Sequence, residues 1–363
     1  MPPKPSDYFL SDADNAAIFE QQIRPAEFGG QASISPALPT APNSRPVCII
    51  LAGQTGAGKS HAAPALVAAL NKIAAPLSHN LCHLVADTHK PYHPAYAGLV
   101  ADAAAGRVPP GLASAATGHD ARRWLARACS VAASQKLTAL VESASRYPQD
   151  VVEMAGTFRS AGYRVCLVLL GVHPVQSRLG LLARFLEAST QAPSEEDDTS
   201  GRKKMPVRLT PRAIHDESYA GLASLAEMLD EQGSDSNENV LGDAVLILRR
   251  GNQVAYANDW QSATGSWQAS PAGVSQALAA ERARRARPGS QDASPLATEA
   301  ALFASDVARL RAAHSGRAAE LDAFAAEYET AAPQKGNVQD GKEPAYYPLD
   351  PDALVAHLQG SEW

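Results

Sequence analysis

The chain has 363 residues and a hydrophobic share of 45%, which suits one large or two ordinary domains with a substantial core. A formal net charge of −6 and a pI near 5.9 argue against a general nucleic-acid binder, while leaving room for a local basic patch. There is neither an apolar leader nor a run of roughly 18 apolar residues. We therefore expect a cytoplasmic bacterial protein with no nucleic-acid or membrane partner. Delivery into another cell by a dedicated export machine stays open.

The cysteines are scattered along the chain, and no pair has metal-binding spacing. Three of them lie in apolar runs, which is typical of small buried hydrophobes in a reducing compartment. The four cysteines are Cys48, Cys82, Cys129 and Cys166.

The first predicted element is an amphipathic helix of about 14 residues that begins after a capping Ser11 and ends before Pro25. A loop rich in Gly, Pro and Ser follows over residues 26–46. Residues 47–52 are apolar throughout, which indicates a strand buried on both faces, as in a parallel sheet.

A glycine-rich motif follows this strand at the spacing G-x-x-x-x-G-K-S, which predicts a phosphate-binding P-loop. Gly53, Gly56 and Gly58 permit a tight turn with the backbone N–H groups directed at phosphate oxygens. Lys59 brings a positive charge to the β- and γ-phosphates, and the Ser60 hydroxyl can ligate Mg²⁺. A helix that starts here adds its positive N-terminal end. The predicted ATP-binding residues are Gly53, Gln54, Thr55, Gly56, Ala57, Gly58, Lys59, Ser60 and His61.

Strands and helices then alternate, which predicts an α/β fold with a parallel sheet and helices on both faces. Further strands are expected over 81–86, 137–141, 163–170 and 244–249, and helices over 61–72, 95–108, 119–135, 148–160, 174–188 and 211–231. Segments 87–94, 109–118 and 232–240 read as loops, and 193–208 as a mobile acidic and then basic excursion. A turn at 251–252 leads to an edge hairpin at 254–256.

The remainder is expected to be a helical appendage that stabilises the core. Its helices are predicted over 277–287, twice between 295 and 331, and over 351–359, with a loop over 333–348. The predicted division is an N-terminal helix and loop (1–46), a P-loop kinase domain (47–260) and a helical C-terminal extension (261–363).

Three polar residues lie where consecutive strands end. In open parallel sheets, ligands bind beyond the carboxyl ends of the strands, so Ser60, Asp87 and Glu142 should meet in one crevice. Asp87 can accept the proton of an acceptor hydroxyl, with a Mg²⁺ ligand or a helix cap as alternatives. Glu142 suits substrate hydrogen bonding or water-mediated Mg²⁺ binding, against a solvated strand-end carboxylate.

The segment after residue 170 has the position of a kinase lid, where arginines close on the phosphates. Arg178, Arg184 and Arg202 are the candidates, although exposed helix arginines are usually only solvated. Arg184 is favoured because apolar neighbours at 181, 182 and 185 would fix its direction, and Arg202 is second.

Several motifs in this order resemble the zeta toxins, the P-loop kinases of epsilon/zeta toxin–antitoxin systems. The resemblance covers about residues 8–260 and is more specific than the P-loop alone. The segments that carry it are Ile18-Phe19-Glu20, Ile23-Arg24-Pro25, the P-loop, Asp87 to Tyr96 (Asp-x-x-Lys-x-x-His-Pro-x-Tyr), Ala161 to Val165, and His215 to Gly221.

The resemblance implies that Asp87 is the catalytic base, that Lys59 and Ser60 handle phosphate and Mg²⁺, and that Arg184 and Arg202 are the lid arginines. The family's Glu-Gly-Thr-x-Arg run stands here as Glu142-Ser143-Ala144-Ser145-Arg146, so the acceptor is in question. Lys90, His93 and Arg146 can serve an acceptor's diphosphate, although His93 also fits a packed loop histidine.

Three hypotheses follow. The first is an ATP-dependent kinase of the amino-sugar 3′-hydroxyl of UDP-N-acetylglucosamine, paired with an antitoxin protein, as the family implies. The second is a kinase of NAD at the adenosine ribose, as in effector proteins that resemble zeta toxins. The third is a nucleotide-dependent switch or interaction module. A GTPase switch would normally carry an N/T-K-x-D run for base recognition, and none is found after a suitable strand.

Overall fold

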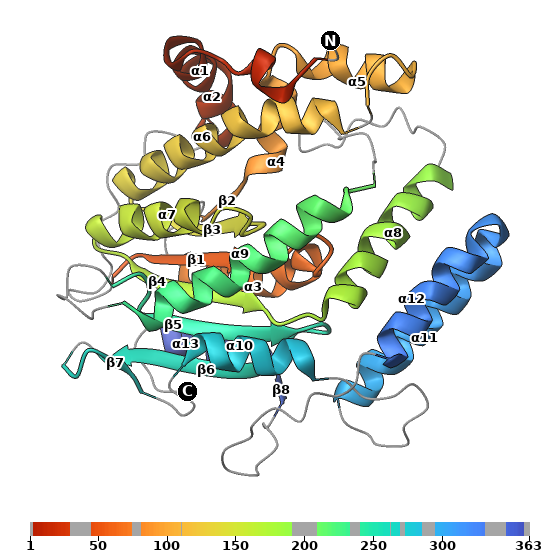
Figure 1. Ribbon diagram of the computed structural model, residues 1–363. Coiled ribbons are helices and arrows are strands. Elements are labelled where there is room, and N and C mark those ends of the chain that lie inside the picture. The colour runs from red at the N-terminus through yellow and green to blue at the C-terminus, as the bar shows by residue number, and fades with distance from the viewer. Residues whose placement is uncertain are drawn as a thin grey trace.

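The fold is a mixed sheet enclosed by helices (Figure 1). The computed structural model describes residues 3–29, 45–74, 81–109, 111–190, 209–232, 240–261, 263–268, 273–284, 295–330 and 346–358. In these ranges eight strands form one sheet with the order β2-β3-β1-β4-β5-β6-β7, and β8 also pairs with β6. The strands are β1 (Val47–Ala52), β2 (Leu81–Val85), β3 (Thr138–Ser143), β4 (Arg164–Leu170), β5 (Ala244–Arg249), β6 (Gln253–Gln261), β7 (Ser266–Trp267) and β8 (Tyr347–Pro348).

The strands β2, β3, β1, β4 and β5 are parallel, as the alternation of apolar strands and helices predicts. β1 lies in the middle of this set, with β3 on one side and β4 on the other. The carboxyl ends of β1, β2 and β3 therefore meet at one edge of the sheet. The predicted α/β class is confirmed.

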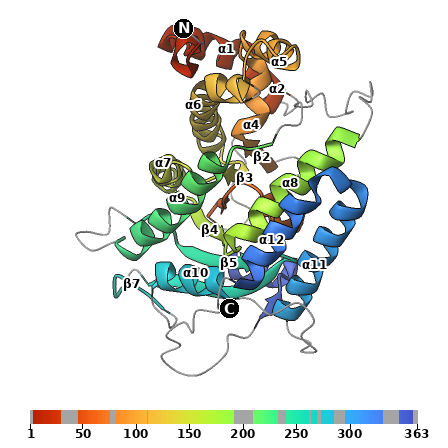
Figure 2. The same ribbon diagram turned by 45° about the vertical axis from the view of Figure 1, so that its right-hand side comes forward.

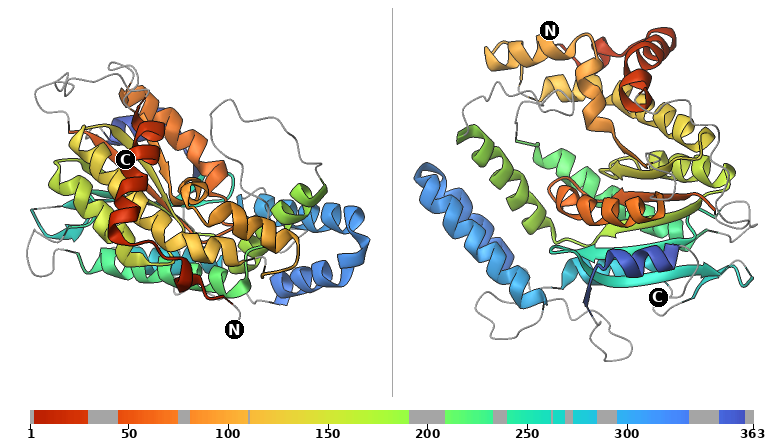
Figure 3. Two further views of the ribbon diagram at one scale, coloured as in Figure 1. Left: turned by 90° about the horizontal axis from the view of Figure 1, so that it is seen from above. Right: turned by 180° about the vertical axis from the view of Figure 1, so that it is seen from behind.

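Helices cover both faces of the sheet. Because side chains alternate along a strand, Cys48 and Ile50 of β1 pack into one apolar cluster and Ile49 and Leu51 into another. The first cluster lies under α6 (Leu112–Ser134), α7 (Pro148–Ser160), α9 (Arg212–Asp230) and α10 (Val274–Ala283); the second lies under α3 (Lys59–Ala74) and α13 (Pro351–Leu358). The rear view in Figure 3 shows α3 and α13 side by side.

A third apolar cluster joins α8 (Pro174–Thr190) to the helical pair α11 (Pro295–Ala313) and α12 (Ala318–Thr330). Leu179 and Leu182 of α8 pack there with Phe303 and Tyr328. Figure 2 shows the three helices together, beside the sheet. The C-terminal region therefore reaches the helix that follows β4, and its parts α10 and α13 belong to the main core.

The N-terminal helix is longer than predicted. It runs through α1 (Asp12–Ile18), a π-helical turn (Phe19–Ile23) and α2 (Arg24–Phe28), so the prediction that it ends before Pro25 is wrong. The Arg24 N–H donates to the Phe19 carbonyl in the π turn, and Pro25 falls in the first turn of α2, where no N–H is needed. Residues 30–44 of the predicted loop lie outside the described residues.

Two predicted loops contain helix. Residues 86–92 form α4 (Ala86–His89) and a 3₁₀ turn (Lys90–Tyr92), with Pro91 at a position that tolerates it. α6 begins at Leu112 instead of residue 119, because the alanine-rich start of this segment buries Leu112, Ala113 and Ala116 against α5 (Tyr96–Ala104). Short 3₁₀ turns also occur at Pro5–Tyr8 and Ser315–Arg317.

The hairpin after β5 is confirmed as antiparallel, but β6 is longer than predicted and is not an edge strand. Alternate residues of β6 are buried, and β7 and β8 pair with its two ends. α10 begins three residues before its predicted start, since Val274 is buried in the core. In the described ranges no helix is both long and apolar enough to cross a membrane.

Candidate nucleotide and acceptor sites

The P-loop connects β1 to α3 in the conformation that its glycines require. Gly56 and Gly58 have positive φ angles of 79° and 103°. A Cβ on Gly56 would lie 2.0 Å from the Ser177 carbonyl oxygen of α8, so only glycine fits. No atom lies within 4 Å of a Cβ built on Gly58, which leaves open space beside the loop.

Lys59 lies over the loop, where Nζ donates to the Gly53 carbonyl at 2.7 Å. Burial lowers the pKa of Lys59 to about 8; Glu142 and Asp87 oppose this shift, and Arg184 adds to it. Lys59 therefore lies within electrostatic range of Glu142 of β3, Asp87 of α4 and Arg184 of α8.

Gln54 fixes the start of the loop from behind. Its Nε2 donates to the Val172 carbonyl at 2.8 Å, and its Oε1 accepts from Arg282 of α10 at 3.2 Å. Gln54 is fully buried, so both contacts are shielded from water. The side chain therefore anchors the loop to the β4–α8 connection and to α10.

Asp87 stands at the start of α4, immediately after β2, and its side chain is 64% exposed. Lys90 is an ion-pair partner at 2.5 Å, and it also donates to the Ser114 hydroxyl of α6 at 2.6 Å. The buried Lys90 thus holds Asp87 at the surface of the crevice. Asp87 and Lys90, two of the residues predicted to bind the acceptor, therefore contact each other directly.

Glu142 lies within β3, one residue before its end, instead of just past it. Its Oε1 and Nε2 of His83 are 2.8 Å apart. Arg146 follows in the next loop and pairs with Glu217 of α9. A Cβ on Gly221 would lie 1.9 Å from the Ser145 carbonyl oxygen, so this glycine lets α9 approach the loop that carries Arg146.

His93 is 3% exposed and does not reach the surface of the crevice. Its Nδ1 accepts from the Ala95 N–H at 3.2 Å, so Nε2 carries the proton and donates to the Tyr8 carbonyl at 3.1 Å. Burial lowers the pKa of His93, although Asp120 opposes the shift. These contacts give His93 a role in holding the N-terminal segment.

The three predicted lid arginines differ in their surroundings. Arg184 is exposed on α8, three residues after Leu181, which packs against the P-loop near Gly56. Arg184 has no ion pair among the described residues. Arg178 instead pairs with Glu327 of α12. Arg202 lies outside the described residues.

The loop's donor set fits the phosphates of a nucleotide. It combines a partly buried ammonium group, open space at Gly58 and a buried Thr55 hydroxyl that has no partner in the structure. Mg²⁺ fits only as an ion shared with phosphate oxygens and the exposed Ser60 hydroxyl. Across the described ranges, no group of three or more His, Cys, Asp or Glu could hold a metal alone.

Four residues near the loop were not predicted as site residues. Arg250 donates to the Gly56 carbonyl at 3.0 Å, and Arg282 to Gln54. Ser177 and His215, 2.7 Å apart at Oγ and Nε2, link α8 to α9 beside Gln54. The motif around His215 was a signal for the last of these. Nothing in the sequence distinguishes the two arginines from their neighbours.

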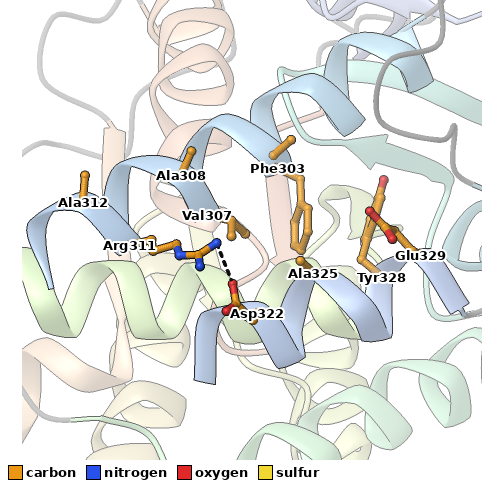
Figure 4. A pocket seen from close by; sticks show the side chains of 10 residues that line it. Phe303, Val307, Ala308, Arg311, Ala312, Asp322, Ala325, Tyr328 and Glu329 are labelled. Atoms are coloured by element: carbon orange, nitrogen blue, oxygen red, sulfur yellow. Dashed lines mark ion pairs between the residues drawn. The ribbon is translucent and has the colours of Figure 1, made fainter. Parts of the chain in front are cut away.

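A groove of about 430 Å³ lies away from these residues, between α11 and α12. Figure 4 shows its mostly apolar wall, with Phe303 and Tyr328 near one end and the ion pair of Arg311 and Asp322 farther along. Neither the P-loop nor any predicted acceptor residue lines it.

The chain matches the sequence model of the zeta toxin family over residues 32–261, which is more than half of its length. A solved structure from the PezAT chromosomal toxin–antitoxin system of the human pathogen Streptococcus pneumoniae is 18% identical, with a TM-score of 0.46, over 70% of this chain and 83% of that chain. None of the curated proteins matches. The extent of the family match shows that the chain belongs to the zeta toxin family.

Proposed function

We propose that the protein is an ATP-dependent small-molecule kinase that transfers phosphate to a sugar hydroxyl of UDP-N-acetylglucosamine. The observation that carries this proposal is the meeting of P-loop and carboxylates at one sheet edge. Lys59 of the loop interacts electrostatically with both Asp87 and Glu142. A phosphate-binding loop and a carboxylate suited to accept a proton therefore lie at the same sheet edge, which supports a kinase.

The proposed step moves one phosphoryl group and one proton. The acceptor hydroxyl oxygen bonds to the γ-phosphorus, the bond to the β–γ bridging oxygen breaks, and ADP leaves. Asp87 takes the hydroxyl proton, with Lys90 keeping its carboxylate in place. Lys59 and Arg184 compensate charge on the phosphates. Mg²⁺, when bound at Ser60, supplies further charge compensation.

The acceptor's diphosphate would contact Arg146 and Lys90. Family members that phosphorylate UDP-N-acetylglucosamine carry Gly-Thr where this chain has Ser143-Ala144. Ser145 adopts a positive φ of 56°, and its N–H donates to the Ser143 hydroxyl at 3.0 Å. The changed residues therefore take part in the structure of this loop, and NAD is the second candidate acceptor, as in effector proteins that resemble zeta toxins.

The test is a transfer assay with labelled ATP and Mg²⁺. The full chain receives UDP-N-acetylglucosamine, NAD or no acceptor, beside the Asp87→Ala variant. Phosphorylated UDP-N-acetylglucosamine from the wild type only is the expected result. Phosphorylated NAD would show that NAD is the acceptor, and the assignment as a kinase would stand. Nucleotide binding without transfer to either acceptor would exclude both and favour an interaction module.

Membership of the zeta toxin family also leads us to propose an antitoxin, a protein encoded beside this one that blocks the ATP site. Co-purification with the neighbouring gene product should yield a complex, and that product should inhibit phosphoryl transfer. A neighbour that neither binds nor inhibits would contradict the pairing and leave the kinase proposal intact.

A further inference from the structure

Two arginines, one directly after β5 and one on α10, hydrogen-bond the P-loop. Arg250 follows β5 directly and is partly buried. One of its terminal nitrogens donates to the Gly56 carbonyl at 3.0 Å and to the Gln176 carbonyl of α8 at 2.7 Å. A Cβ on Gly180 would lie 2.7 Å from that nitrogen, so this contact depends on glycine in α8.

Arg282 belongs to α10, beyond the end of the family match, and is 4% exposed. It donates to Gln54 Oε1 at 3.2 Å and to the Tyr219 carbonyl of α9 at 3.0 Å. Its guanidinium carbon lies 3.7 Å from the centre of the Tyr219 ring. The side chain therefore joins the loop to α9 and α10 in a fixed orientation.

Neither arginine forms an ion pair with a carboxylate within the part of the chain that the structure describes. Burial lowers the pKa of Arg282 to about 10 and also lowers the pKa of Arg250. The adjacent Arg249 differs, since Glu281 at 3.0 Å and Glu299 at 2.7 Å compensate its charge. All hydrogen-bond acceptors of Arg250 and Arg282 are neutral carbonyl or amide oxygens.

A buried cation that pairs with no carboxylate is unfavourable, and a further anion nearby stabilises it. Glu299 and Asp306 act on Arg250 through their charges without pairing with it, and they only oppose the effect of burial on its pKa. Each of the two guanidinium groups also hydrogen-bonds an oxygen atom of the P-loop itself, so both charges lie next to the loop. Together with Lys59, they form three cations around one turn of chain.

We propose that Arg250 and Arg282 form a charged base beneath the P-loop, which positions the loop and increases its affinity for the polyphosphate of a nucleotide. The inference rests on the proposed function in that the ligand is a nucleoside triphosphate. It extends the nucleotide site to α10, outside the family's matched region. The affinity gain grows with the charge of the ligand, so ATP benefits more than ADP, and ADP more than AMP.

The experiment measures dissociation constants by calorimetry with the full chain, for ATP, ADP and AMP without Mg²⁺, whose negative charges decrease in that order. Arg282→Gln and Arg250→Gln each remove one charge. Arg282→Lys keeps the charge. Arg284→Gln is the matched control, because Arg284 directly follows the same helix and its side chain pairs with Glu281. Thermal melting reports whether each variant keeps its fold.

We expect each of the Arg250→Gln and Arg282→Gln variants to bind ATP about tenfold more weakly and AMP almost unchanged, because charge interactions in this setting scale with ligand charge. Arg282→Lys should retain most of the ATP affinity, and Arg284→Gln all of it. An equal loss for all three nucleotides, or no loss, would overturn the charged base. A wild type that binds no nucleotide would instead overturn the proposed function.

Discussion

The residues that we propose to bind the nucleotide, here called the donor half, differ in how their charges are satisfied from those that we propose to bind the acceptor, here called the acceptor half. In the donor half, Lys59, Arg250 and Arg282 all donate to neutral oxygen atoms of the P-loop. In the acceptor half, each charged group has an ionisable partner. The pairs are Lys90 with Asp87, His83 with Glu142, and Arg146 with Glu217.

This difference separates a preorganised site from one that must exchange partners. The donor cations need no rearrangement to meet an anion, so their loss should weaken nucleotide binding directly. An acceptor's diphosphate must compete with Glu217 for Arg146, and its hydroxyl must find Asp87 beside Lys90. Changes in the acceptor half should therefore alter turnover and acceptor KM, with nucleotide affinity unaffected.

The largest effect is expected for Asp87→Asn. The amide keeps the shape of the side chain but cannot accept the proton, so kcat should fall about 10³-fold, within the usual contribution of a general base. The dissociation constant of ATP should stay unchanged. Rapid-quench measurement of transfer, with calorimetry of ATP binding, checks both values.

Asp102→Asn is the matched control, because Asp102 of α5 also forms an exposed ion pair. Its partner is Arg107, at 2.6 Å. It should keep wild-type turnover. If Asp87→Asn retains turnover within about tenfold of wild type, proton transfer to Asp87 is not the general-base step that carries catalysis.

The second effect concerns the donor half. Lys59→Gln removes the ammonium group over the loop and should reduce kcat/KM for ATP about 10²-fold, the scale of one lost charge-stabilising donor. In contrast to the Asp87 variant, it should also weaken ATP binding. Lys72→Gln, at the other end of α3, removes an exposed lysine paired with Asp352 at 2.5 Å and serves as control. Full activity of Lys59→Gln would contradict the P-loop assignment.

The third effect is a pH dependence confined to the donor half. Because burial lowers the pKa of Lys59 to about 8, the ammonium group loses its proton above that pH, and ATP affinity should fall about tenfold over the next pH unit. Lys59→Gln should show a flat profile over the same range. A wild-type profile that stays flat to pH 9.5 would mean that Lys59 remains charged.

The lowered pKa of Lys59 has the opposite effect on stability, which rises with pH where ATP affinity falls. Between about pH 8 and the ordinary lysine value of 10.5, the unfolded chain binds more protons at this residue than the folded chain. The contribution of Lys59 to the free energy of unfolding therefore rises with pH in that window. Urea titrations of wild type and Lys59→Gln at pH 7 and 9 would show this difference.

Much of the donor site and the order of the fold follow from local sequence, because a strand, a glycine turn and a helix are contiguous. Asp87 and Glu142 lie within electrostatic range of Lys59, as expected of residues near the carboxyl ends of neighbouring parallel strands. Residues 112–118 were predicted as part of a loop, whereas burial of Leu112 and Ala116, which depends on the packing of α5, stabilises a helix there.

The role of Arg282 depends on packing that no local pattern reveals. Four arginines occur between residues 282 and 287, and only the contact of α10 with α9 and Gln54 singles out the first. His93 illustrates the reverse case. Its motif suggests a substrate contact, but the packing of the N-terminal segment places both ring nitrogens in internal hydrogen bonds.

The smallest effect tests the exchange of partners in the acceptor half. Glu217→Gln removes the ion pair of a half-exposed carboxylate with Arg146, and such pairs are worth well under the energy of a tenfold change. The freed arginine should lower the acceptor KM about threefold, whereas Arg146→Gln should raise it about tenfold. Glu227→Gln, exposed on the same helix, should change neither value. An increase in KM for Glu217→Gln would show that the carboxylate positions Arg146 for the acceptor, so that the acceptor half is preorganised as well.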